Sequence, residues 1–146
     1  MRKASIFILF ITSIIIEGSF AQAPELMIDS CAAAAGDDAT YLKDFVVILP
    51  AATDQQNPPI ARYPLVLSKS NIYRFSICNS RESKGVAVLQ LYDSNRLIFS
   101  SYNKDTGEEF NPFNFMCQKT GIYHVFISFE EGKEGQAVGI LSYVTK

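Results

Sequence analysis

The sequence of 146 residues contains no tryptophan, only one histidine and three cysteines. Sites for zinc and other transition metals need several histidine or cysteine ligands, and this sequence has few residues that could supply them. Basic side chains are also not in excess, because the sequence has 13 Lys and Arg and 15 Asp and Glu, which gives a net charge of −2. A dedicated nucleic-acid binder needs a basic surface, and this composition argues against one. The hydrophobic fraction of 48% predicts a folded domain and argues against intrinsic disorder.

Long hydrophobic runs are confined to the N-terminus. Arg2 and Lys3 precede an almost purely apolar stretch over residues 4–16, and Ser19-Phe20-Ala21 offers small residues at −3 and −1 of a cleavage site. The apolar stretch is shorter than the ~20 residues that a membrane-spanning helix needs. We therefore expect a signal peptide over residues 1–21, one domain over residues 22–146, and a periplasmic or extracellular destination. An uncleaved anchor is the alternative.

All three cysteines lie in the domain that we expect to be exported to an oxidising compartment. One disulfide and one leftover thiol is the simplest arrangement, and sequence alone leaves three pairings open. A Cys31–Cys117 bond would close the longest loop and fix the segment around Cys31, so we favour this pairing, with Cys78–Cys117 next. The leftover cysteine is expected to be a small buried residue.

Short segments rich in β-formers, separated by turns, fill the rest of the chain. The clearest half-buried strand is Tyr73-Arg74-Phe75-Ser76-Ile77-Cys78, in which large apolar side chains alternate with polar or small ones. Asp29 or Ser30 and Gly36 mark one short helical turn over 29–36. The sequence predicts an all-β fold, an antiparallel, jelly-roll-like β-sandwich of about eight strands. The expected strands include 45–49, 63–67, 73–78, 86–92, 97–99, 122–129 and 137–144, with an irregular one through Phe113 and Phe115.

Three motifs carry a family resemblance. Tyr73-x-Phe75-x-Ile77, Leu89-x-Leu91-Tyr92-Asp93 and Thr120-Gly121-x-Tyr123-x-Val125-x-Ile127 resemble the bacterial pre-peptidase C-terminal domain. The resemblance implies a small jelly-roll sandwich with an accessory or binding role beside secreted hydrolases, and it brings no catalytic residues. The chain departs from that family in having three cysteines, an added N-terminal segment and no hydrolase domain beside it.

Candidate catalytic and metal-binding residues are few. His124 has no second histidine and no Gly-x-Ser-x-Gly motif to work with, so we expect an ordinary strand histidine and no enzyme. The acidic residues near 93 and 105–109 are expected to be solvated loop acids, since a glycosidase needs two carboxyl groups held across a cleft. Asn103, Asp105 and Glu109 alternate as oxygen ligands that Ca²⁺ accepts, although Lys104 lies among them and the full calcium-loop spacing is missing. No other cofactor is expected.

The last two predicted strands are apolar on both faces. Ile122 and Phe126 lie opposite Tyr123 and Val125, and Val138 and Ile140 lie opposite Leu141 and Tyr143, with an acidic hairpin loop expected over 130–135. A sandwich strand usually keeps one polar face toward water. Either loops or the N-terminal segment held by Cys31 cover the second face, or Ile122, Phe126, Val138 and Ile140 form a docking surface.

We therefore expect an exported, non-catalytic module that docks a protein partner, or a second copy, in a bacterial cell envelope. One alternative is a carbohydrate- or surface-polymer-binding domain that uses tyrosines such as Tyr92 and Tyr102. A further alternative is a small hydrolase or hydrolase inhibitor.

Overall fold

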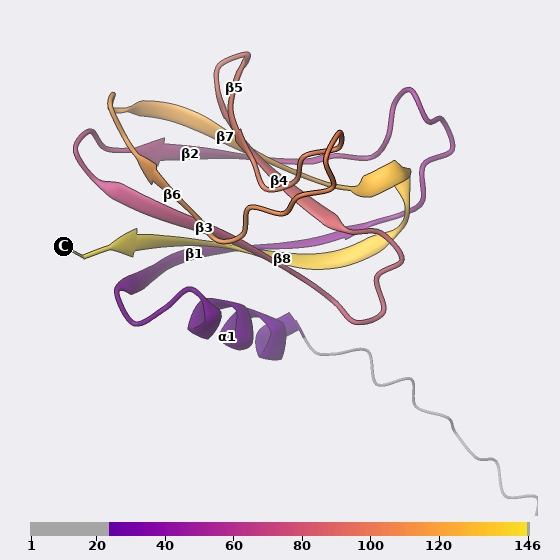
Figure 1. Ribbon diagram of the computed structural model, residues 1–146, viewed down its shortest axis with the longest axis horizontal. Coiled ribbons are helices and arrows are strands. Elements are labelled where there is room, and N and C mark those ends of the chain that lie inside the picture. The colour runs from indigo at the N-terminus through magenta and orange to yellow at the C-terminus, as the bar shows by residue number, and fades with distance from the viewer. Residues whose placement is uncertain (1–23, 146) are drawn as a thin grey trace, which may run out of the picture.

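The computed structural model describes residues 24–145, which form one α-helix, eight β-strands and a single 3₁₀ turn (Figure 1). The elements are α1 (Pro24–Ala34), β1 (Ala39–Leu49), β2 (Ala61–Leu67), β3 (Ile72–Asn79), β4 (Ala87–Asp93), β5 (Arg96–Ser100), β6 (Phe113–Met116), β7 (Gly121–Phe129), η1 (Glu130–Gly132) and β8 (Gly135–Val144). The predicted signal peptide over 1–21 lies outside the described residues. No helix in the described range is long and apolar enough to cross a membrane.

The strands form two four-stranded antiparallel sheets. Sheet A has the order β1-β8-β3-β6, and sheet B has the order β2-β7-β4-β5. Successive strands alternate between the sheets except for the β4–β5 hairpin, and this double Greek-key arrangement is a jelly roll. The predicted fold class, an antiparallel jelly-roll-like sandwich of about eight strands, is confirmed.

The core lies between the two sheets and follows the alternation of the strands. Tyr73, Phe75 and Ile77 of β3 point inward, and the inward residues of β4 and β7 meet them from sheet B. The fully buried members of this core include Phe45, Phe75, Leu89, Leu91, Val125 and Ile127. Each such side chain stabilises the fold by roughly 1.5–3 kcal/mol through removal of apolar surface from water.

Helix α1 is longer than the predicted turn over 29–36 and begins five residues earlier. Pro24 stands at the first helical position, where its missing N–H costs no hydrogen bond, and Glu25 adds a favourable charge to the first turn. Gly36, with φ of 98°, lies just past the end of the helix, in a conformation that favours glycine. Met27 and Cys31, four residues apart, form its buried side.

The segment between the last two strands is not the expected hairpin. β7 pairs with β2 and β4, whereas β8 pairs with β1 and β3, so the 3₁₀ turn η1 carries the chain from sheet B to sheet A. The second faces of these two strands therefore lie on opposite sides of the sandwich.

Candidate functional site

Helix α1 covers the outer face of sheet A (Figure 1). Val138 and Ile140 of β8 are fully buried there, packed with Met27 and Cys31 of the helix. The prediction that Val138 and Ile140 belong to a docking surface is wrong. The alternative, cover by the N-terminal segment, holds for this face because the helix supplies the apolar partners that the strand needs.

Arg74 of β3 fastens the end of α1 to sheet A. Its guanidinium donates hydrogen bonds to both carboxylate oxygens of Asp38, at 2.6 and 3.0 Å, and to the carbonyl oxygen of Ala35. The hydrogen bond from Arg74 is the main reason why the pKa of Asp38 lies below its usual value. The connection from α1 to β1 is thus held by a charged pair as well as by packing.

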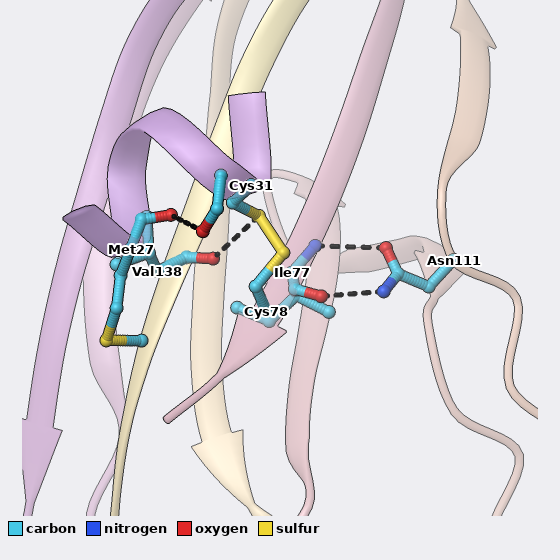
Figure 2. The surroundings of a disulfide bond; sticks show 7 residues. Met27, Cys31, Ile77, Cys78, Asn111 and Val138 are labelled. Carbon is cyan, nitrogen blue, oxygen red and sulfur yellow. Dashed lines mark hydrogen bonds between the residues drawn. A yellow bond between two sulfur atoms is a disulfide. The ribbon is translucent and has the colours of Figure 1, made fainter. Parts of the chain in front are cut away.

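A disulfide joins Cys31 of α1 to Cys78 of β3, with the two Cα atoms 5.9 Å apart (Figure 2). The favoured pairing Cys31–Cys117 and its runner-up Cys78–Cys117 are both wrong. The helix lies over the outer face of β3, where Cys78 points, whereas Cys117 follows β6 and is buried in the core between the sheets. Cys117 remains a free thiol, as expected for the leftover cysteine.

Within residues 24–145, no helix covers the outer face of sheet B. Its exposed apolar side chains include Val66 of β2 and Ile122 of β7, which are register partners and are 73% and 61% exposed. Pro64 of β2 and Leu97 of β5 are also exposed on this face, and the half-buried His124 and Tyr92 lie between them in the register. We call this set the sheet B row, and it consists of Pro64, Val66, Leu97 and Ile122.

Polar and aromatic side chains border the sheet B row. The ring of Phe126 lies 4.6 Å from that of Tyr92, and the Arg62 guanidinium lies 5.1 Å from the centre of the Phe126 ring. Phe126 is therefore half-buried, and of the two predicted candidates on β7 it is Ile122 that stays exposed. The register partners of His124 are Pro64 and Tyr92, so neither is an acid that could orient it as a general base.

The acidic segment after β5 folds into a short hairpin, residues 101–110, which we call the 101–110 hairpin. Tyr102 and Glu109 face each other across it, and Asn103 donates its backbone N–H to the carbonyl oxygen of Glu108 at 2.9 Å. The side chain of Asn103 accepts a hydrogen bond from the backbone N–H of Asp105. Within residues 24–145, no three acidic, histidine or cysteine side chains cluster as a metal site. The predicted calcium ligands Asn103, Asp105 and Glu109 thus receive no support.

A hollow of about 480 Å³ lies between this hairpin and strands β4 and β5. Tyr102, which the sequence had suggested, lines it, together with Gln90 and Phe110, which the sequence had not. Tyr92 is not among the lining residues. Alternation on β4 places Gln90 on the outward face, but the approach of Phe110 depends on the hairpin.

The side chains of Tyr123 and Cys117 form a polar contact that is buried between the sheets. The phenol of Tyr123 donates to the carbonyl oxygen of Lys119 at 2.6 Å, and the Cys117 sulfur lies 3.7 Å from the phenol oxygen. Burial, followed by the contact with Cys117, raises the pKa of Tyr123 to about 12. Both side chains are buried, at 4% and 1% exposure, so the pair has the character of a structural contact.

No protein-family model matches the chain, and no curated protein sequence matches it significantly. The resemblance to the pre-peptidase C-terminal domain stays a prediction. The motif residues that suggested it, including Phe75, Leu89 and Val125, are core residues of the jelly roll.

Proposed function

We propose that this protein is an exported, non-catalytic accessory module that docks a partner protein in a bacterial cell envelope. The docking surface is the sheet B row, in which Ile122 and Val66 form an exposed cross-strand pair. The observation that carries the proposal is the difference between the two outer faces of the sandwich. On sheet A, helix α1 covers Val138 and Ile140, whereas on sheet B the neighbouring residues Val66 and Ile122 are 73% and 61% exposed.

The composition of this face supports a protein as the ligand. Exposed apolar side chains lie beside Tyr92, Phe126 and Arg62, and interfaces between proteins are rich in aromatic residues and arginine around an apolar centre. Exposed apolar side chains that lie side by side, as Val66 and Ile122 do, are typical of interaction sites on soluble proteins.

Export to an oxidising compartment has two supports. The basic and apolar residues 1–21 have the pattern of a signal peptide. Cys31 and Cys78 form a disulfide, which is typical of proteins outside the cytoplasm.

Site-specific photo-crosslinking in the native envelope tests the proposal. A photoreactive residue at Ile122 is expected to give one defined adduct, which Val66→Asp abolishes because a charge then lies inside the contact. The purified partner is expected to bind Val66→Asp about tenfold or more weakly than wild type.

Ile48 provides the matched control, because it is 70% exposed on β1 of the opposite sheet. A photoreactive residue at Ile48 should give no such adduct, and Ile48→Asp should leave the affinity for the partner unchanged. Adducts of equal yield from both positions, or an adduct that joins two copies of this chain, would contradict the proposal.

A further inference from the structure

The hollow beside the 101–110 hairpin has the size and the lining of a small-ligand site. Its volume of about 480 Å³ falls in the range of roughly 300–1,000 Å³ that is common for such sites. The floor comes from β4 and β5, and the hairpin forms the opposite wall. The lining residues include Gln90, Leu97, Tyr102, Asn103, Lys104 and Phe110.

Backbone hydrogen bonds hold the hairpin wall in place. Phe110 donates its N–H to the carbonyl oxygen of Ser101 at 2.8 Å, and Gly107 donates to that of Asn103 at 2.8 Å. Ser101 is in turn tied to Leu89 of β4, since its N–H donates to the Leu89 carbonyl and its hydroxyl accepts from the Leu89 N–H. Because these hydrogen bonds already fix the wall, ligand binding loses little conformational entropy there.

An aromatic ring stands on this wall. Phe110 is 44% exposed, and its ring lies edge-on to Phe99 with the centroids 6.3 Å apart. Phe99 stacks on Phe113, which stacks on Phe75 in the centre of the core. Four rings in contact thus connect the hollow to the core, and Phe110 presents a firmly held apolar surface to a ligand.

Most of the uncommitted polar atoms in the hollow are hydrogen-bond donors. The Gln90 carbonyl oxygen accepts from the Tyr92 hydroxyl at 3.4 Å and the Asn103 carbonyl oxygen accepts from Asp105, which leaves the two amide N–H₂ groups. Four groups lining the hollow have no hydrogen-bond partner within residues 24–145. They are the two amide nitrogens, the Tyr102 hydroxyl and the Lys104 ammonium. A matching ligand must therefore offer several oxygen acceptors.

The charge around the hollow favours a neutral ligand. Lys104 brings one positive charge, but Asp105, Glu108 and Glu109 follow it in the same hairpin. Lys104 is the only charged side chain that lines the hollow, and the negative charge of the hairpin as a whole offsets its attraction for an acidic ligand.

We propose that this hollow is a binding site for a neutral saccharide. A sugar ring offers an apolar C–H face for Phe110 and hydroxyl oxygens for Gln90, Asn103 and Tyr102. The site uses other residues than the sheet B row apart from Leu97 at its border, so saccharide binding is a function additional to partner docking and stands without it.

Titration of the ¹⁵N-labelled protein with neutral oligosaccharides tests the site. The probes are cellobiose, maltose, N,N′-diacetylchitobiose and α-mannobiose at millimolar concentration, with glucuronic acid as the charged comparison. We expect saturable shifts of the amide resonances of Gln90, Ser100, Tyr102 and Asn103 with at least one neutral probe.

Two variants locate the binding. Tyr102→Ala and Gln90→Leu should weaken the affinity at least tenfold while the folded spectrum is retained, because they remove a ring or an amide donor from the hollow. Tyr41→Ala, on strand β1 of the other sheet, is the matched control and should bind as wild type does.

Three results would overturn the assignment. They are the absence of saturable shifts with all four neutral probes, preference for glucuronic acid over them, and shifts that map away from the hollow. Ile122→Asp should leave saccharide binding unchanged, so failure of the docking proposal can be told apart from failure of this one.

Discussion

Within residues 24–145, Ser76 places a buried hydroxyl without a hydrogen-bond partner on the covered face of sheet A. It lies on the outward side of β3, between the inward residues Phe75 and Ile77, and it is 5% exposed. Its hydroxyl has no hydrogen-bond partner among the described residues. A buried hydroxyl without a partner destabilises the folded state, because it loses its hydrogen bonds to water.

We therefore predict that Ser76→Ala raises the free energy of unfolding by about 1 kcal/mol, measured by urea denaturation. Ser101→Ala is the matched control, since the equally buried hydroxyl of Ser101 accepts a hydrogen bond from Leu89 at 2.9 Å. That substitution should lower the free energy of unfolding by about 1–3 kcal/mol. A loss of stability in Ser76→Ala would show that its hydroxyl has a partner.

Some of the candidate residues could be assigned from the sequence and others could not. The alternation of β7 places Ile122 opposite the buried Val125, and this prediction needs only the strand period. Val138 and Ile140 obey the same period, but their exposure depends on whether another element covers the face. Because the cover comes from α1, distant along the chain, local pattern does not reveal it.

The disulfide is the strongest link between helix α1 and the sandwich. An isolated helix of 11 residues is marginal in water, so α1 depends on its packing and on its bond to β3. Cys31 and Cys78 are 47 residues apart, and closing a loop of this length stabilises a fold by about 4 kcal/mol in the chain-entropy model.

We predict that the double variant Cys31→Ala, Cys78→Ala loses about 4 kcal/mol in urea denaturation. Cys117→Ala tests the pairing, because it should leave the disulfide intact and cost only the loss of a small buried side chain. Peptide mapping without reductant should then link the segments around Cys31 and Cys78. A linked peptide that contains Cys117 would contradict the structure.

At the scale of elements, strands are easier to predict from this sequence than their partners. The alternation Tyr73-Phe75-Ile77 and the run 86–92 mark β3 and β4 from local pattern alone. The expected 130–135 hairpin is absent because the chain changes sheets at η1, which depends on the whole jelly roll. For the same reason, the disulfide partner of Cys31 could be predicted only from the position of α1 over β3, which the sequence pattern does not reveal.

At the scale of the whole molecule, the described residues 24–145 form three layers, helix α1, sheet A and sheet B. The stability of this fold has an alkaline limit. Tyr123 is buried between the sheets, and its pKa rises from 10.0 to about 12. Because the folded state holds the protonated phenol more tightly, this contribution to stability is complete below pH 10. It is lost as the pH rises from 10 to about 12.

We predict that wild type loses stability over this interval and that Tyr123→Phe loses less, with urea denaturation at successive pH values as the measurement. The dependence should not vanish, because burial also raises the pKa of Tyr63. Identical pH profiles for wild type and Tyr123→Phe would refute the prediction. At neutral pH the variant should be less stable, since the Lys119 carbonyl loses the hydrogen bond from the Tyr123 phenol.

The Cys31–Cys78 bond also determines how the molecule responds to tension along its chain. β1, β2 and most of β3 lie inside the covalent loop that this bond closes. A pulling force on the two ends passes through the sulfur atoms and does not extend this loop. Some 47 residues, or roughly 160 Å of fully extended chain, are thus withheld from stretching until the bond is reduced. When both sheets have come apart, the oxidised protein is therefore a shorter tether than the reduced protein by this length.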